Sequence, residues 1–102
     1  MRWSRDGDVG QVTLAMTFRI ETAVRGRVTV FMLIGRIEKQ AIAELRRLFE
    51  GQTDYRQIVL DLKDVVVIDR EVMRFFVGCE ADGVRLEHCA PYIREWMQRE
   101  KD

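Results

Sequence analysis

Apolar residues along this chain form two kinds of pattern, short runs and repeats at helical spacing. Short apolar or alternating runs, typical of β-strands, occupy residues 18–22, 28–34, 58–62, 65–68 and 84–87. Apolar residues three and four positions apart, which mark one face of a helix, recur in residues 38–50, 70–80 and 91–100. The runs at 28–34 and 58–62 are nearly all apolar, so we expect these strands to be covered on both faces.

The order of these segments predicts one α/β domain with a mixed β-sheet. A hairpin that turns at Gly26 opens an order of strand-strand-helix-strand-helix-strand-helix. Strands joined by a helix are expected to be parallel, through right-handed crossovers. We place this domain at residues 16–102. Residues 1–15 form an N-terminal extension, which we expect either to be poorly ordered or to extend the first strand; Met16 is an alternative start.

The centre of the chain, residues 58–83, is predicted to run strand, connector, helix. Lys63 interrupts the apolar residues, so we expect a break before the run 65–68. Asp69 follows that run just before the helical pattern begins, where a carboxylate can cap the free N–H groups of a helix. With Asp69 as the cap, Glu71 becomes the second residue of the helix, where a negative charge is favourable.

This central stretch resembles the STAS domain, the fold of bacterial anti-sigma-factor antagonists. The resemblance spans roughly residues 18–97 and is carried by the strand at 60–62, the connector at 66–69 and the helix that follows. Helix starts in that family usually read Asp-Ser-Ser-Gly, and a partner kinase phosphorylates the second Ser or a Thr in its place. Asp69 matches the first motif residue, whereas Glu71 stands at the phosphorylated position.

Glu71 therefore has two interpretations. In the first, a permanent carboxylate replaces a phosphate that would carry a charge of about −1.5 to −2. In the second, Glu71 is only a favourable residue for the first turn of a helix. Both predict no phosphorylation switch here, because Arg70 and Val72 fill the other motif positions and residues 65–102 contain no Ser or Thr.

The helix at residues 70–80 has a wider apolar arc than a helix on one sheet face needs. One explanation is a deeply buried helix, covered by neighbouring loops or the N-terminal segment. The other is that Met73 and Val77, at the edge of the arc, belong to a docking surface. The candidate partner-binding residues are those of the helix start and this edge: Asp69, Arg70, Glu71, Met73, Arg74 and Val77.

Two sets of potential metal ligands are weighed and set aside. The first is Asp61, Asp64 and Asp69, and the second is Cys79, His88 and Cys89. Three carboxylates could hold Mg²⁺, but Asp69 is expected to be a cap and no phosphate loop follows. The second set is split between a helix end and the far end of the next strand, and a structural zinc site needs four ligands. We predict no metal, cofactor or catalytic residue, and two free thiols.

Charge and hydrophobicity narrow the range of partners. Lys and Arg total 17, as do Asp and Glu, so the net charge is 0, which argues against binding nucleic acid by bulk charge. The longest apolar run, residues 28–34, is far shorter than the ~20 residues of a membrane-spanning helix. No apolar core of a secretory signal is seen in residues 1–10. We expect a cytoplasmic protein without membrane insertion.

The resemblance implies a non-enzymatic module that binds a regulatory protein, typically a kinase-type anti-sigma factor, through the start of its central helix. The alternative is a small cytoplasmic STAS-like structural subunit of a transporter, such as a lipid-transport ATPase complex. Fuller family members carry another strand and helix after residue 102, so an open sheet edge could also support a homodimer.

Overall fold

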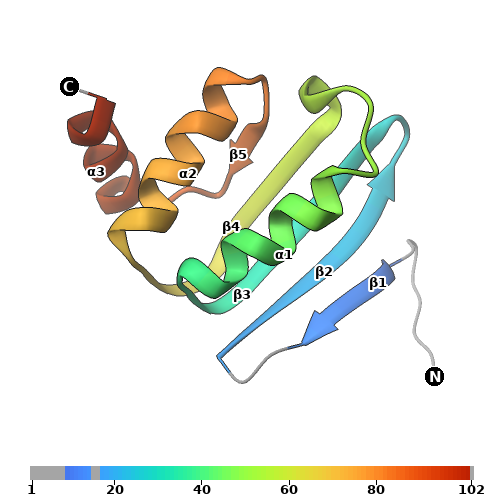
Figure 1. Cartoon of the computed structure of the whole chain (residues 1–102), viewed down its shortest axis with the longest axis horizontal. Helices are drawn as coiled ribbons and strands as arrows, with labels where there is room; N and C mark the ends of the chain where they lie inside the picture. Colours follow the sequence, from blue (N-terminus) through green and yellow to red (C-terminus); the bar gives the residue numbers. More distant parts are fainter. Residues whose placement is uncertain (1–8, 15–16, 102) are drawn as a thin grey trace.

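The computed structural model describes residues 9–14 and 17–101, which form a mixed five-stranded sheet with three α-helices (Figure 1). The elements in chain order are β1 (Val9–Leu14), β2 (Phe18–Arg25), β3 (Val28–Ile37), α1 (Lys39–Phe49), the 3₁₀ turn η1 (Tyr55–Gln57), β4 (Ile58–Ile68), α2 (Arg70–Ala81), β5 (Arg85–Glu87) and α3 (Pro91–Lys101). The predicted α/β class and element order are confirmed, with β1 added in front. No helix in the described ranges combines the length and apolarity that a membrane crossing needs.

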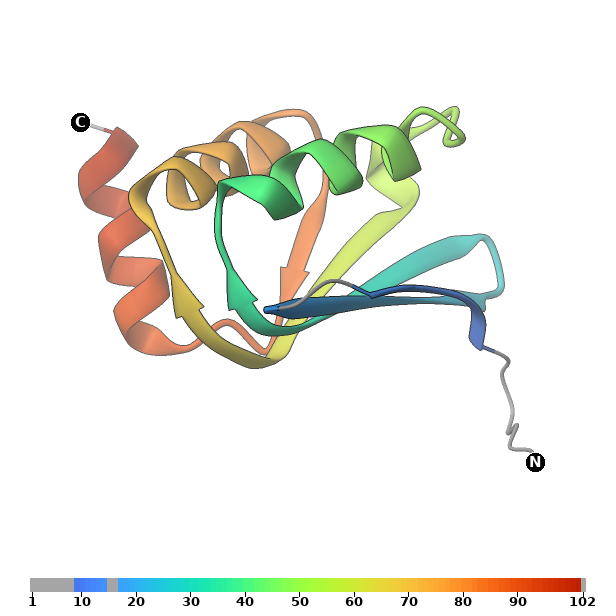
Figure 2. The ribbon, with the colours of Figure 1, turned by 60° about the horizontal axis from the view of Figure 1, so that its bottom comes forward.

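The sheet keeps the order of the chain, β1-β2-β3-β4-β5. The first three strands are antiparallel neighbours, whereas β4 and β5 each pair in parallel with the strand before. Because both parallel steps go in the same direction across the sheet, right-handed crossovers place α1 and α2 on the same face. Figure 2 shows both helices on one side of the sheet, with α3 beside α2 on the flank away from α1.

Strand β4 is continuous, so the expected break at Lys63 and Asp64 is wrong. Along their pairing, β4 advances three residues from Asp61 to Asp64 while β3 advances two. Such an extra residue is a β-bulge, which bends a strand without ending it. A second shift leaves Val66 as an extra residue with its side chain 68% exposed. Lys63 and Asp64 therefore mark a bulge and not the end of the strand.

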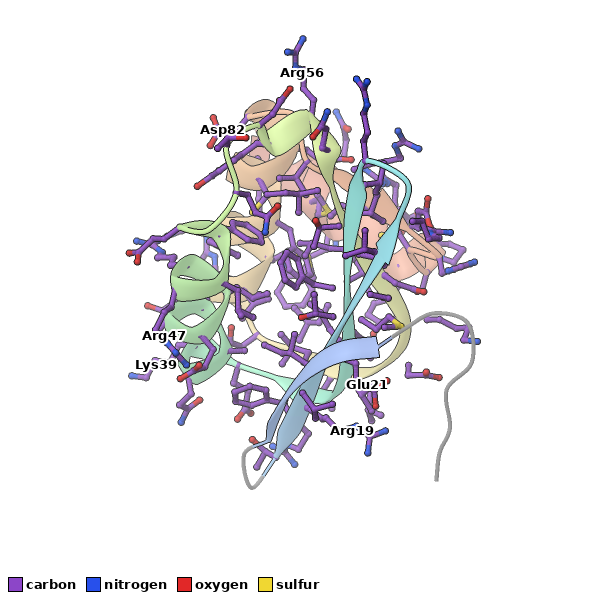
Figure 3. All side chains as sticks on the ribbon, turned by 90° about the vertical axis from the view of Figure 1, so that its right-hand side faces the viewer. Arg19, Glu21, Lys39, Arg47, Arg56 and Asp82 are labelled. Atoms are coloured by element: carbon purple, nitrogen blue, oxygen red, sulfur yellow. The ribbon has the colours of Figure 1, made fainter. Side chains whose placement is uncertain are left out.

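Side chains from one face of the sheet and from all three described α-helices fill a common core (Figure 3). The buried residues of α2 are Val72, Met73, Phe76 and Cys79, and those of α3 are Ile93 and Met97. The wide apolar arc of α2 is explained by three neighbours, because the sheet lies beneath it, α1 packs along one flank and α3 packs along the other. Among the described residues it is α3, rather than a loop, that covers this flank.

The sheet face opposite α1 and α2 is closed by charged side chains. Val30 and Val59 pair on this face and are only 4% and 1% exposed. Arg25 on β2 donates to Glu87 on β5 at 3.2 Å, across the two strands between them. Since the aliphatic part of an arginine covers apolar surface while its head stays in water, Arg25 helps to shield Val59, with which it lines a shallow hollow on this face.

Candidate functional site

Asp69 joins the starts of two helices. Its Oδ1 accepts a hydrogen bond from the Val72 N–H at 2.9 Å, which confirms the predicted N-cap of α2. Its Oδ2 accepts from the N–H of Lys39, the first residue of α1, at 3.2 Å. Glu38, just before α1, makes no side-chain cap and pairs with Arg36. One carboxylate therefore caps both helices and holds their positive ends side by side.

Glu71 is exposed and lines a groove between α1 and α2, at the end where both helices begin. The groove has a volume of about 560 Å³ and is lined by Lys39, Ile42, Ala43, Arg46, Glu71, Arg74 and Phe75. Three of these residues are basic and one is acidic. Glu71 therefore contributes a negative charge at the edge of a mainly cationic groove.

Arg70 and Arg74 are turned toward α3. The Nε of each donates to the Glu100 carboxylate, at 3.2 and 3.0 Å respectively. The hydrogen bond from Arg74, together with the charge of Arg70, holds the pKa of Glu100 below its ordinary value. Farther along α2, Arg94 of α3 donates to both oxygens of Glu80, at 2.9 and 2.8 Å. These pairs fix α3 antiparallel to α2, with Arg74 between α3 and the groove.

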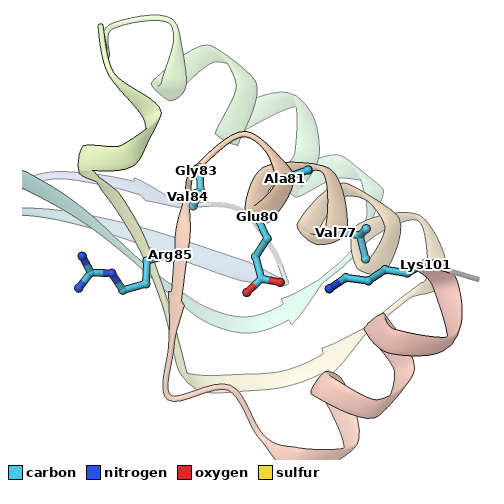
Figure 4. A pocket seen from close by; sticks show the side chains of 7 residues that line it. All are labelled: Val77, Glu80, Ala81, Gly83, Val84, Arg85 and Lys101. Carbon is cyan, nitrogen blue, oxygen red and sulfur yellow. The ribbon is translucent and has the colours of Figure 1, made fainter.

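Met73 is not part of an exposed surface, and its expected place at the edge of the apolar arc is wrong. Its side chain is 0% exposed, because the core closes over it. Val77 is half-buried and lines a different hollow, of about 590 Å³, between α2, β5 and α3 (Figure 4). The structure thus brings Asp69, Glu71 and Arg74 together near the groove and separates Val77 from them.

The groove also contains residues that the sequence did not single out. Lys39 and Arg46 lie at exposed positions of α1, and Lys39 is labelled in Figure 3. Phe75 follows the core periodicity of α2, yet it is only half-buried. The missing signal is the strand order, because periodicity alone does not say that α1 and α2 are neighbours.

Residues of metal-ligand and nucleophile type do not converge in the described part of the chain. It holds no group of three or more His, Cys, Asp or Glu arranged to bind a metal ion. The His88 Nδ1 lies 2.9 Å from the Oδ1 of Asp61, which is in the first half of β4, whereas Asp69 follows the end of that strand. Both cysteines are free, and burial raises the pKa of Cys79 to about 12 and that of Cys89 above its ordinary value. Neither thiol is appreciably ionised at neutral pH.

The sequence was also compared with protein-family models and with curated proteins, and nothing matched in either comparison.

Proposed function

We propose that this protein is a non-catalytic interaction module with a STAS-like domain, which acts in the cytoplasm as anti-sigma-factor antagonists do. It binds a regulatory protein, with a kinase-type anti-sigma factor as the expected partner. The observation that carries the proposal is Glu71, an exposed carboxylate at the second position of a capped helix and beside a groove. The docking residues are Asp69, Arg70, Glu71 and Arg74, without the buried Met73.

In this proposal Glu71 acts as a fixed charge. A carboxylate supplies one negative charge, whereas a phosphoserine supplies about −1.5 to −2 and three acceptor oxygens. A kinase or phosphatase cannot add or remove it, so the partner meets the same surface at all times. Regulation then depends on the amount or state of the partner.

The test is to separate binding from folding at Glu71. A partner is first isolated by pull-down from the native cell, and its affinity is measured by titration calorimetry. Glu71→Gln removes the charge and Glu71→Ser restores the family's residue type, while Glu95→Gln is a matched control on the exposed side of α3. Helix-start electrostatics limits the stability effect at Glu71 to about 0.3–1 kcal/mol, so a larger change in binding free energy supports the proposal.

Two outcomes would contradict it. Unchanged affinity of both Glu71 variants would leave that residue with only a helix-start role. Phosphorylation of the wild-type protein by its partner kinase would show that a switch exists elsewhere.

A structural subunit of a transporter remains the second candidate. It is favoured by the absence of Ser and Thr from residues 65–102, because such a subunit needs no phosphorylation switch. Recovery of a transporter ATPase or permease in the pull-down, with affinity insensitive to Glu71, would decide for this function.

A further inference from the structure

The groove beside Glu71 continues along the whole of α2. Another hollow, of about 410 Å³, adjoins the groove beside Glu71 and shares Arg46, Arg74 and Phe75 with it. The combined groove runs from Glu71, in the first turn of α2, to Asp82, at its C-terminal cap. Because α1 and α2 each follow a parallel strand, they border it as two helices running in the same direction (Figure 1).

Phe75 forms an apolar floor at the middle of this groove. Its ring stacks on Phe49, with 6.1 Å between centroids. Phe49 in turn contacts the rings of Phe31 and Tyr55, at 5.6 and 5.5 Å. Phe75 is therefore supported from the core and half-buried, with part of its surface facing the groove. A supported aromatic of this kind can anchor an apolar side chain of a partner.

The walls of the groove are cationic. The Arg46 guanidinium lies 5.5 Å from the centroid of the Phe75 ring. The ion pairs among the described residues leave Lys39 and Arg46 without a carboxylate partner. Arg74 shares the single carboxylate of Glu100 with a second arginine. Since the chain has a net charge of 0, this positive charge is a local concentration and not a general property.

We infer that the groove binds an acidic, amphipathic helical segment of a partner protein. A helix with an apolar residue against Phe75 and carboxylates on both sides would meet Arg46 of α1 and Arg74 of α2. Nucleic acid fits less well, because its extended backbone would carry phosphates past Glu71 and Asp82 at the two ends of the groove, whereas a helical segment can place its carboxylates beside Arg46 and Arg74 alone. The inference rests on the proposed function in taking a protein as partner, but not on the role of Glu71.

A phage-displayed library of short peptides, selected on the full chain, supplies the probes. We expect enriched peptides to carry Asp or Glu three or four positions from an aromatic or leucine residue, which is one helical turn. Arg46→Glu should weaken their binding about tenfold or more, and added salt should also weaken it. Arg47→Glu is the matched control, since Arg47 lies in the same last turn of α1 but pairs with Glu44 outside the groove. The control should change affinity less than about twofold.

The inference is overturned by no enrichment, by enrichment of basic or uncharged peptides, or by equal binding to the two folded variants. Tighter binding of a single-stranded oligonucleotide would overturn it too. Thermal melts establish that both variants are folded. Peptide binding lost in Arg46→Glu, together with native-partner affinity unchanged in Glu71→Gln, would uphold the groove while refuting the function proposed for Glu71. The opposite pattern would refute the groove alone.

Discussion

The contributions of the two Asp69 hydrogen bonds to stability can be measured separately. Asp69→Ala removes both, and loss of the α2 cap costs about 0.5–2 kcal/mol. The bond to the Lys39 N–H adds about 0.5–1.5 kcal/mol, at the lower end of that range because it is exposed and 3.2 Å long. We therefore expect the free energy of unfolding to fall by about 1–3 kcal/mol.

Asp69→Asn separates the contribution of the α2 cap from that of the α1 cap. The amide keeps one acceptor oxygen and replaces the other with an NH₂ group, which donates and cannot accept. It can therefore cap only one helix, and the shorter bond to Val72, 2.9 Å against 3.2 Å to Lys39, favours α2. The expected loss is the α1 share alone, about 0.5–1 kcal/mol.

Lys39→Pro tests this division. Proline is accepted at the first position of a helix and has no N–H, and the preceding Glu38 is already extended, with φ −120° and ψ −175°. In this background Asp69→Asn should be nearly neutral, whereas Lys39→Ala, which keeps the N–H, should leave its cost unchanged. Urea melts with a common m-value give the double-mutant cycle. An Asp69→Asn cost that is the same with Pro and with Ala at position 39 would refute the shared cap.

Three further predictions follow from burial and backbone geometry. Gly35→Ala should destabilise by more than about 2 kcal/mol, since φ is +99° and a Cβ would lie 2.7 Å from the Thr17 carbonyl oxygen. Gly26 has φ +61°, and a Cβ there would meet nothing within 4 Å. Gly26→Ala should therefore cost only about 1–2 kcal/mol when both variants are compared by thermal melts. Equal costs at the two glycines would contradict the steric argument. Met73→Ala should lower the free energy of unfolding by about 2–5 kcal/mol. A neutral result would show that this side chain is exposed and not buried in the core. Iodoacetamide at neutral pH should leave Cys79 unmodified until the protein unfolds, because burial raises its pKa to about 12, so rapid labelling of the native protein would exclude that burial.

The helices were predictable because their signals are local. Asp69 caps α2 through a residue three positions away, and the helical pattern begins directly after it. The second bond of Asp69 crosses thirty positions to Lys39 and depends on the strand order. The same limit explains why the predicted exposure of Met73 was wrong. A helical wheel gives the width of an apolar face but does not show which flank α3 will cover. Val9–Leu14 escaped recognition as a separate strand because its place in the sheet depends on pairing with β2.

The order of the strands also determines how the protein can open locally. Each described strand is hydrogen bonded in the sheet only to the strands before and after it in the chain, so an outer element can detach without disturbing the centre. The β3–β4 pair extends to Ile68, whereas β5 is held through only three residue pairs. Amide hydrogen exchange should therefore be slowest in β3 and β4 and faster toward β1 and toward β5 with α3. A partner that bound both α1 and α2 in the native structure would slow these local openings. Amide exchange rates would then report on occupancy of the groove.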